Sequence, residues 1–429
     1  MIHEISVSNF NSIRDEVTLD LRIPKTSPAY AKFPTSHSRV DIRLPTVIAL
    51  FGANASGKST ILSALTRLVN FVCTSFDTKP GADIPGMFPF LDREHHDMPT
   101  TFRVEFDANW FTDEDEPTKA DLLRYELVLG SYEKTIAETA GSAGPVWGRD
   151  HVIFEALYRQ VGDYAVPKQR RRWQTLFERE EARIQRKIQV ADWLKMKPSD
   201  SRLAAVRPNA SVISTLAHLN VEWATRILQD MQSVQTNLWG RNRSSSRDPE
   251  SLQALWKYYD DHPEVLDELN RRLRQFDTGI DAVEIQTFPG ERDALFFHKA
   301  LDGALIYEFE SSGTQHIVSM LPRLLYTIQS GHIAVIDEFD ADLHPTLIPE
   351  ILRMFQDPRS NEAKGQLFLT AHNAQILSCL DKEEVVFVEK DEKGGTVART
   401  GLDYQGLRRD VGLEDVYLSG VLGGLPKTG

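Results

Sequence analysis

The 429-residue sequence predicts an α/β fold with a mixed sheet, an antiparallel β meander in its first lobe and a helical insertion between two lobes. Three observations predict this fold. Short apolar runs end at glycine-rich or acidic turns, which is typical of buried parallel strands. Alternating apolar and polar residues fill much of residues 1–180. Helical periodicity dominates residues 181–276, and strands alternate with helices again within residues 277–429.

Composition and charge restrict the class of protein. The chain is 41% hydrophobic and 26% charged, as in an ordinary globular protein. A net charge of −13 argues against a broadly basic surface for nucleic acid, although a local basic groove is compatible with it. The two cysteines, Cys73 and Cys379, form no disulfide framework and no metal-ligand spacing. We find no signal-peptide pattern and no apolar stretch near 18 residues, so we expect a cytoplasmic protein without a membrane span.

Alternating strands are expected from the start of the chain. IHEISVSNF and EVTLDLRI come first, and TTFRVEFDA, LLRYELVLG, HVIFEALYRQ and RRWQTLFERE continue the alternation as a meander. The basic run KQRRRW, with Arg170, Arg171 and Arg172, is a candidate phosphate grip, but a solvated strand edge beside the acidic EREE explains it better. Helices are expected over ARIQRKIQVADWLKM and SVISTLAHLNVEWATRILQDMQ, with a loop at residues 239–250.

Residues 51–60, FGANASGKST, match the G-x-x-x-x-G-K-[ST] pattern of a phosphate-binding P-loop. An apolar run precedes the loop and helical spacing follows it, so strand, loop and helix stand in the required order. A chance match is the alternative. Glycines let backbone N–H groups curl around phosphate oxygens, and the helix N-terminus faces them. In such a loop Lys58 reaches the β- and γ-phosphates of ATP, and the Ser59 hydroxyl binds Mg²⁺. The predicted nucleotide contacts are Gly52, Asn54, Ala55, Ser56, Gly57, Lys58, Ser59 and Thr60.

Two adjacent acids follow a second apolar run. GHIAVIDEFDADLHP places Asp337 and Glu338 at the carboxyl end of the predicted strand IAVI, where ligands bind in open α/β sheets. Successive side chains at a strand end point in different directions, so the two acids suit two tasks. We predict that Asp337 holds Mg²⁺ and that Glu338 polarises the attacking water. The alternative is an acidic first turn of a helix.

Two further segments complete the set of motifs. In QLFLTAHNAQIL, His372 lies just past a predicted strand, where it is placed to contact a γ-phosphate oxygen; capping of the next helix is the alternative. ESSGTQHIVSMLPRLL opens an amphipathic helix at Ser312 and Gly313. A helix N-terminus is an anion site, and plain N-capping by serine is the other interpretation.

In this order, the four segments resemble the ABC-type ATPase heads of the SMC, RecF and OLD kind. The resemblance makes GANASGKS the Walker A loop, Glu338 the catalytic glutamate that ends the Walker B strand, and His372 the switch histidine. ESSGTQ takes the place of the signature motif. DADLHP, with Asp340 and His344, matches the D-loop region. The opening ISVSNFNSIRD also resembles the family's start, and the whole resemblance covers nearly all of residues 1–390.

Within that family, the chain looks like stand-alone phage-defence ATPases of the RloA type, which are relatives of the PARIS and Septu ATPase subunits. RPNASVISTLAHLN, FDTGIDAVEIQ and YLSGVLGGLPK carry this narrower resemblance. The signature is altered, since Thr314 stands where its second glycine is usual. No glutamine precedes Gln160, so the Q-loop glutamine is missing, and Asp92, Glu94 or a backbone carbonyl is the expected replacement. The short stretch after His372 predicts no Toprim nuclease domain.

The resemblance implies a site shared between two chains. ATP at Lys58 of one chain would be closed over by Ser312 and Gly313 of the other, with the stretch from Asp340 to His344 also reaching across. We therefore expect a homodimer or a higher even-numbered oligomer. The predicted function is that of a slow ATPase that acts as a defence sensor and controls a separate effector, a nuclease or toxin encoded nearby.

Other functions stay open at the level of sequence. The main alternative is a RecF- or SMC-like DNA-repair or DNA-clamping ATPase, for which DNA is a possible ligand. A transporter subunit fits less well because the signature is altered and the Q-loop glutamine is missing. A scaffold that does not hydrolyse ATP fits less well because Glu338 and His372 are both present.

Overall fold

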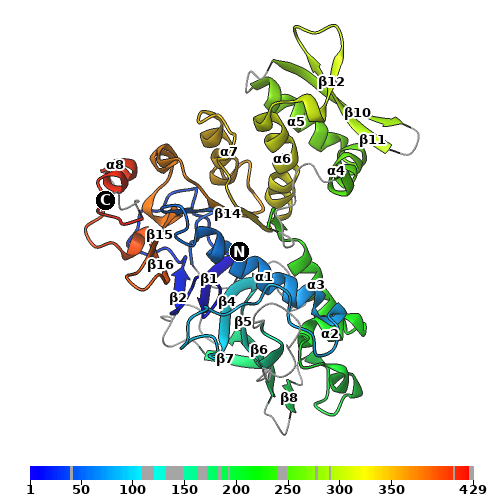
Figure 1. The fold of residues 1–429 in the computed structure, drawn as a ribbon, viewed down its shortest axis with the longest axis vertical. Helices are drawn as coiled ribbons and strands as arrows, with labels where there is room; N and C mark the ends of the chain where they lie inside the picture. Colours follow the sequence, from blue (N-terminus) through cyan, green and yellow to red (C-terminus); the bar gives the residue numbers. More distant parts are fainter. Residues whose placement is uncertain are drawn as a thin grey trace.

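The structure is a computed structural model in which two large sheets enclose a layer of helices (Figure 1). The larger sheet is antiparallel. The structure describes residues 1–38, 42–108, 120–131, 148–161, 172–181, 186–191, 194–238, 249–275, 279–288, 291–408 and 411–424.

The antiparallel sheet has seven strands in the order β2-β1-β4-β5-β6-β7-β8. Its strands are β1 (Ile2–Ser8), β2 (Val17–Asp20), β4 (Thr100–Ala108), β5 (Asp121–Gly130), β6 (His151–Val161), β7 (Arg172–Glu181) and β8 (Arg186–Val190). From β4 to β8 each strand pairs with the next along the chain, so the predicted meander is confirmed.

The second sheet has six strands in the order β16-β15-β3-β14-β13-β9. All its pairs are parallel except β15 with β16. The strands are β3 (Val47–Phe51), β9 (Gln235–Thr236), β13 (Ile333–Ile336), β14 (Gln366–Thr370), β15 (Val385–Lys390) and β16 (Thr396–Thr400). The adjacent strands β3, β14 and β13 therefore bring the P-loop, His372 and the two acids to one edge, because parallel strands share their carboxyl ends.

The parallel sheet separates two hydrophobic cores. Along β3, Ile48 and Leu50 belong to the core shared with the antiparallel sheet, whereas Val47, Ala49 and Phe51 belong to the other core. This alternation is the two-residue period of a strand. Both faces are buried, which explains why the strand is apolar throughout.

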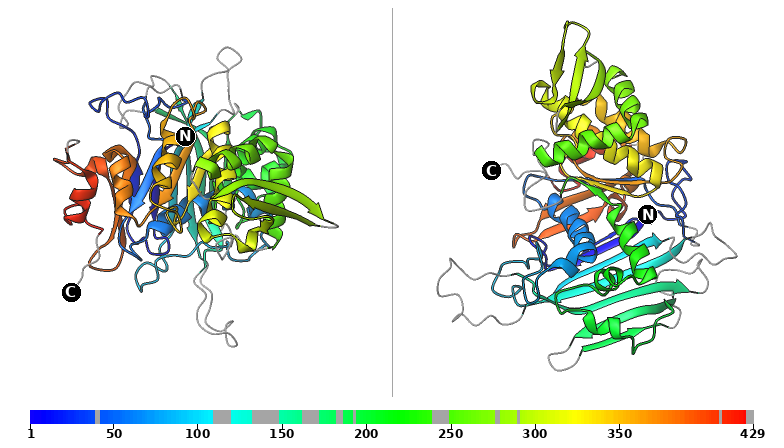
Figure 2. Two further views of the ribbon diagram at one scale, coloured as in Figure 1. Left: turned by 90° about the horizontal axis from the view of Figure 1, so that it is seen from above. Right: turned by 90° about the vertical axis from the view of Figure 1, so that its right-hand side faces the viewer.

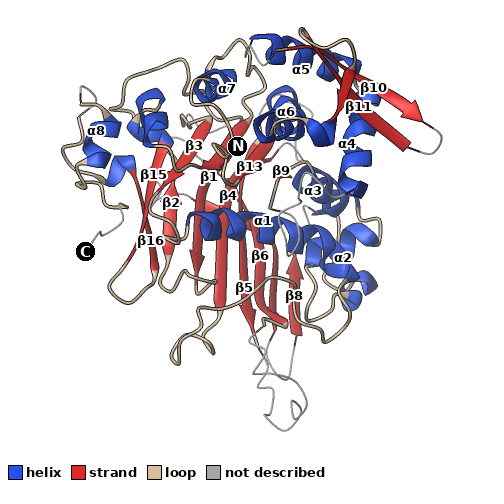
Figure 3. Ribbon diagram, turned by 45° about the horizontal axis from the view of Figure 1, so that its top comes forward, coloured by secondary structure: helices blue, strands red, loops and turns tan. Residues whose placement is uncertain are grey.

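Helices cover both faces of the parallel sheet (Figures 2 and 3). α1 (Lys58–Thr74), α2 (Val212–His218) and α3 (Glu222–Gln232) contribute to the core on the side of the antiparallel sheet. α4 (Pro249–Asp261), α5 (Pro263–Gln275), α6 (Ser312–Ser330), α7 (Leu347–Gln356) and α8 (Leu413–Leu418) contribute to the opposite core. Next to α4 and α5 lies a small antiparallel sheet of β10 (Ile280–Phe288), β11 (Glu291–His298) and β12 (Ala304–Ile306).

The segment at 181–276 differs in part from its predicted helical structure. ARIQRKIQVADWLKM was expected to be helical, and this is wrong at β8, where Ile188 and Val190 alternate with polar residues and the strand pairs with β7. The period of two outweighs the helical spacing there. The short strand β9 also lies inside the segment and adds an edge to the parallel sheet beside β13. The division into two lobes and an insertion stays a prediction.

One expectation about apolar stretches also needs correction. α1 and its short continuation, Lys58–Asp77, are long and apolar enough to cross a membrane by length and composition, alone among the described helices. More than half of the apolar window is buried inside the fold. A core helix packed on both sides must be apolar on most of its surface, and this explains the composition of α1.

Candidate nucleotide-binding site

The P-loop follows β3 and is shaped by two glycines that a larger residue cannot replace. A Cβ on Gly52 would lie 2.1 Å from the carbonyl oxygen of Val388, and one on Gly57 would lie 2.1 Å from Thr396 Oγ1. Gly57 also has φ +111°, a region that side chains disfavour. The loop is thus held against β15 and β16, and α1 begins directly after it at Lys58.

Lys58 is buried and bonded within the loop. Its Nζ donates to the carbonyl oxygens of Gly52 at 2.7 Å and Ala53 at 3.1 Å. Burial lowers the pKa of Lys58, while Asp337, Asp340 and Glu338 act to raise it. A lysine held in the P-loop among three carboxylates is placed to meet the phosphates of a nucleotide.

Asp337, at the end of β13, is the centre of a hydrogen-bond network. Its Oδ1 accepts from Ser59 Oγ at 2.9 Å and from Thr370 Oγ1 at 2.6 Å. Asn237, just after β9, donates to the backbone oxygen of Asp337 and accepts from its backbone N–H, both at 2.9 Å. The structure therefore joins Ser59 and Asp337, which the sequence predicted to share one metal ion.

Glu338 and His372 lie beside this network. Glu338 has φ +51°, and its backbone N–H donates to Thr370 Oγ1 at 2.8 Å. Asp340 Oδ2 accepts from the backbone N–H groups of His372 at 2.9 Å and Asn373 at 2.7 Å. Asp340 thus ties the loop after β13 to the loop after β14, and both predicted hydrolytic side chains are attached to rigid strand ends.

Glu338 and His372 line an open cleft of about 620 Å³. It is formed by the P-loop on one side and by the two loops just described on the other. Its lining is Ser12, Asn54, Ala55, Ser56, Gly57, Lys58, Ser59, Thr60, Glu338 and His372. Gly52 lines an adjoining hollow, which shares Asn54, Ser56 and His372 with the cleft.

The signature-like residues lie elsewhere in the chain's fold. Ser312 and Gly313 open α6 and are absent from the lining of the cleft. The N-cap is Ser311, whose Oγ accepts from the Thr314 N–H at 3.1 Å, so Ser312 does not cap the helix. Ser312 is exposed. A Cβ on Gly313 would lie 2.6 Å from the Asp342 oxygen, which places the start of α6 against the D-loop region.

His344 shares this exposed surface. Its Nδ1 lies 2.8 Å from Thr346 Oγ1, and it is absent from the lining of the cleft. The structure therefore separates the predicted site residues into two groups. One group surrounds the P-loop, and the other lies on the surface formed by the start of α6 and the loop after β13.

Sequence reasoning missed four residues of the site. Asn237, Thr370, Ser12 and Thr396 all bond to the motif residues or to one another. Thr370 ends a predicted strand two residues before His372, and Ser12 lies in the opening segment ISVSNFNSIRD that resembles the family's start. Both positions therefore carried a signal in the sequence. Asn237 and Thr396 are brought in by β9 and β16, whose pairing in the sheet no local pattern indicates.

Asp92 and Glu94, two of the expected substitutes for the Q-loop glutamine, are not among the described residues that line the cleft. Asp92 Oδ1 accepts backbone N–H groups of its own loop, including that of Glu94 at 3.0 Å. Asn9 anchors the same loop by donating to His95 and Met98 oxygens, both at 2.7 Å. Of the basic run, Arg170 and Arg171 fall outside the described residues, and Arg172 is exposed at the start of β7.

The donor groups of the cleft fit Mg²⁺ and a phosphate chain. Mg²⁺ prefers oxygen ligands, and the Ser59 hydroxyl and the Asp337 carboxylate are already within hydrogen-bond distance of each other. Ser56 Oγ is buried in the P-loop without a hydrogen-bond partner among the described atoms, as expected of a group that awaits a phosphate oxygen.

A family model described as "AAA domain, putative AbiEii toxin, Type IV TA system" matches residues 160–378, just over half of the chain. That range contains Asp337, Glu338 and His372. No curated protein matches the sequence.

Two solved structures show partial similarity. One is an SMC head bound to the C-winged helix domain of ScpA, with 11% identity, a TM-score of 0.47, and coverage of 97% of this chain and 99% of that chain. The other is the SMC head domain from Thermotoga maritima, with 11% identity, a TM-score of 0.38, and coverage of 93% and 98%.

The fold of this chain is a mixed α/β fold built around a P-loop. A strand, a P-loop and a helix stand beside a parallel strand that ends in two acids, and an antiparallel sheet packs on the same helix. By the family model that matches just over half of its length, the chain belongs to the AAA-domain family described as "AAA domain, putative AbiEii toxin, Type IV TA system".

Proposed function

We propose that the chain binds and slowly hydrolyses ATP, and that ATP closes two copies of it into a dimer. The observation that carries the proposal is the division of the site. Lys58, Glu338 and His372 line one open cleft, whereas Ser312 is exposed on a separate surface of the same chain. A cleft that lacks its covering anion site in one chain is completed by a second copy that supplies it.

The motif residues at the cleft have separate proposed roles. Lys58 exchanges its bonds to the Gly52 and Ala53 oxygens for bonds to the β- and γ-phosphates. Ser59 and Asp337 would hold Mg²⁺, which supplies charge neutralisation at the phosphates when it is bound.

Glu338 orients and polarises the attacking water, and His372 donates to the γ-phosphate. Asp340 positions His372 through its backbone N–H. Because His372 and Glu338 stand on loops tied to neighbouring strands, loss of the γ-phosphate changes contacts at both loops together.

ATP acts in this scheme as a bridge between chains. Ser312 and Gly313, at the N-terminus of a 19-residue helix, add hydrogen bonds to a γ-phosphate held by the partner's P-loop. The region from Asp340 to His344 contacts the partner near the same phosphate. Hydrolysis removes these bonds, so the dimer opens, and the nucleotide biases a two-state equilibrium.

We further propose that this switch regulates a separate effector in the cytoplasm, as part of an antiviral defence system. The family description refers to a toxin of a toxin–antitoxin system, and this supports a role in which the ATPase acts with a second component. The resemblance to RloA-type defence ATPases supports the same role. A nuclease or toxin encoded nearby is the proposed partner.

The test uses the Glu338→Gln variant, expressed with its native neighbouring genes and purified by a tag. We expect it to bind Mg-ATP and stay closed, because removal of the carboxylate lowers hydrolysis by about a hundredfold or more. Its native mass is compared with and without Mg-ATP. The matched control is the double variant Lys58→Ala/Glu338→Gln, which lacks the phosphate-binding lysine and is expected to keep one mass under both conditions.

The outcomes separate the two candidate functions. An even-numbered assembly that forms only with Mg-ATP and carries a second polypeptide supports the effector proposal. An ATP-dependent dimer that carries DNA and no second polypeptide would instead favour a DNA-clamping ATPase. A mass that does not respond to Mg-ATP in Glu338→Gln would contradict the shared-site proposal itself.

A further inference from the structure

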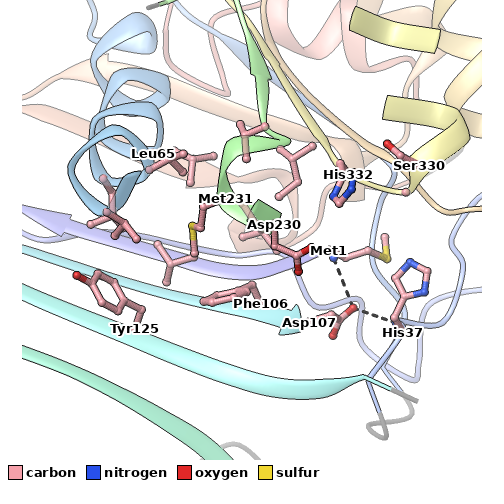
Figure 4. Close-up of a pocket in the computed structure, with 18 of the residues that line it drawn as sticks. Met1, His37, Leu65, Phe106, Asp107, Tyr125, Asp230, Met231, Ser330 and His332 are labelled. Carbon is pink, nitrogen blue, oxygen red and sulfur yellow. Dashed lines mark hydrogen bonds and ion pairs between the residues drawn. The ribbon is translucent and has the colours of Figure 1, made fainter. Parts of the chain in front are cut away.

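A second cavity, of about 250 Å³, lies between α1 and the antiparallel sheet and shares no lining residue with the nucleotide cleft (Figure 4). The cavity is lined by residues of the middle of α1, of β4 and β5, of the end of α3, and of the turn that joins α6 to β13. An engineered apolar cavity of about 150 Å³ in another protein binds benzene, so this volume is large enough for a small organic molecule.

The inner part of the cavity is apolar. Leu65 and Val69 of α1, Phe106 of β4 and the Tyr125 ring of β5 line it, and each is less than a tenth exposed. The Tyr125 hydroxyl donates to Glu155 at 2.9 Å, so its polar atom is engaged elsewhere and only its ring contributes to the lining. An apolar wall of this kind favours a hydrocarbon or aromatic body.

The other end is polar and partly exposed. Figure 4 shows Asp107, Asp230, His37 and His332 together on the side opposite to Leu65 and Tyr125. This arrangement orients any occupant, because its apolar part must face α1 and its polar part must face the opening. Pockets of this design, apolar with a few convergent polar groups, are typical of small-molecule sites.

The polar end is rich in hydrogen-bond acceptors. Burial alone would raise the pKa of Asp107, but His3 and the amino terminus, 3.6 Å away, outweigh it and hold this pKa below its usual range. Burial lowers the pKa of His37 to about 4 and also lowers the pKa of His332. Asp107 already accepts from His3 and from the His37 backbone N–H and lies beside the amino terminus, so Asp230 is the carboxylate at the opening that is placed to meet a cationic donor.

We propose that this cavity is a binding site for small amphipathic amines, with an apolar body of about six to ten heavy atoms against α1 and a cationic head at Asp230. The body removes the apolar lining from water, and the head donates charge-assisted hydrogen bonds. The occupant contacts α1, which begins directly after the P-loop at Lys58, and the turn before β13, the strand that Asp337 follows. The site is nevertheless separate from the nucleotide cleft.

The test is calorimetric titration of the full chain, without nucleotide, with n-alkylamines from butylamine to heptylamine. Alcohols and carboxylates of the same chain lengths are titrated alongside. We expect affinity for the amines to rise about fourfold per added methylene until the cavity is filled. We expect an amine to bind about tenfold more tightly than the matching alcohol, and the carboxylate more weakly still.

Two variants locate the binding. Asp230→Asn, at the partly exposed end, should weaken amine binding about tenfold and leave alcohol binding nearly unchanged. Val69→Phe, which fills the inner part, should abolish binding of the longer amines. The matched control is Asp293→Asn, a half-buried acid on β11 outside the cavity, which should bind amines like the unaltered chain.

Three results would overturn the inference. They are the absence of saturable amine binding at millimolar concentration, equal affinity for amines and alcohols, and unchanged amine binding by Asp230→Asn. If Val69→Phe fails to fold, the Asp230→Asn comparison alone decides between support and refutation, because its side chain lies at the open end and the substitution keeps its size.

Discussion

Asp337 shows how one residue assembles a site from distant parts of the chain. Its carboxylate is bonded by Ser59 and Thr370, and its backbone is bonded on both sides by Asn237. These partners come from α1, β14 and the segment after β9. A carboxylate held by several donors keeps one orientation, which a metal ligand requires.

Asn237 is therefore expected to affect ATPase activity, although it belongs to none of the sequence motifs. In Asn237→Ala the backbone N–H and C=O of Asp337 lose their partners, and we predict a loss of about 1–3 kcal/mol in the free energy of unfolding. We also predict that ATP hydrolysis falls about tenfold because Asp337 is no longer fixed. Denaturant titration and steady-state ATPase assays check both values.

A matched control separates stability from activity. The side-chain amide of Asn361 also bonds backbone groups, with Phe355 O and Gly365 N among its partners, but Asn361 is buried and lies away from the cleft. Asn361→Ala should lose similar stability and keep its ATPase rate per folded molecule. Equal loss of activity in both variants would show that Asn237 has no specific role in the site.

At the residue scale, the sequence predicts the groups to which we assign the chemistry, and it misses the groups that hydrogen-bond to them. Lys58, Glu338 and His372 belong to patterns with fixed spacing, so they are found without a structure, and the cleft brings them together. Asn237 and Thr396 act through tertiary contacts with partners that lie 100 and 340 residues away in the sequence. Single side-chain hydrogen bonds of this kind leave no periodic signal in the sequence.

At the scale of elements, the P-loop packs closely against β16, and the P-loop sequence pattern does not predict this contact. Gly57 faces Thr396, whose Oγ1 donates to the Ser56 oxygen at 3.0 Å and lies 2.8 Å from Ser12 Oγ. The loop, β16 and the turn after β1 thus form one hydrogen-bonded unit. A change of loop shape must move these elements together.

Gly57→Ala tests this packing. Its Cβ would lie 2.1 Å from Thr396 Oγ1 on a backbone with φ +111°, so the loop must shift. We predict that ATP affinity, measured with a fluorescent nucleotide, falls more than about tenfold, because the loop amides lose their phosphate geometry.

The control for this prediction is Gly406→Ala. Gly406 also has a positive φ, +83°, but nothing lies within 4 Å of its added Cβ. That variant carries the cost of the backbone conformation alone, about 1 kcal/mol, and should bind nucleotide normally. If Gly406→Ala weakened nucleotide binding as much as Gly57→Ala, the contact with Thr396 would not be the cause.

The segment around His37, at one end of the antiparallel sheet, should make stability depend on pH. Burial lowers the pKa of His37 to about 4 in the folded chain, below its ordinary value of 6.5. The unfolded chain therefore binds more protons between these pH values, so stability is lost as the pH falls from about 6.5 to about 4. From pH 7.5 to pH 5 this group costs about 2 kcal/mol.

Denaturant titrations at several pH values measure this loss. His37→Gln should show a fall that is smaller by about 2 kcal/mol, because its side chain cannot take up a proton. Other histidines with lowered pKa values, His3 and His332 among them, contribute equally to both proteins. His344→Gln, which changes an exposed histidine, should keep the full fall. A full fall in His37→Gln would refute the assignment.

Whether a segment forms a strand or a helix was easier to predict from the sequence than the sheet to which a strand belongs. Alternation correctly indicates β4 to β7, and apolar runs correctly indicate β3, β13 and β14. The sequence predicts a helix at β8 because Ile184, Ile188 and Ala191 fit a helical spacing over a short window. β9 has two residues, too few for any period, and only its pairing with β13 reveals it.

At the scale of the whole molecule, the layered arrangement explains why the chain separates its two groups of site residues. α1 lies between the two sheets, whereas α6 lies on the opposite face of the parallel sheet (Figure 2). The P-loop and the start of α6 are therefore fixed to different layers. Large, shared cores make their relative shift within one chain costly, which favours completion of the cleft by a second chain.

The measurement that tests this claim most directly is complementation between two inactive variants. Lys58→Ala loses the phosphate-binding lysine. Ser312→Glu puts a negative charge on an exposed side chain at the start of α6, where it would repel a phosphate of the partner's nucleotide. Each should hydrolyse ATP at least about a hundredfold more slowly than the unaltered chain. Ser251→Glu, an exposed serine at the start of α4, is the matched control and should remain active.

The two inactive proteins are mixed at equal concentration and the ATPase rate is measured. If the cleft is shared, half of the dimers are mixed, and each mixed dimer has one site with an intact Lys58 and an intact Ser312. The predicted rate is about a quarter of that of the unaltered protein. A mixture that remains as inactive as its two components would contradict the shared site and would require each chain to complete its own cleft.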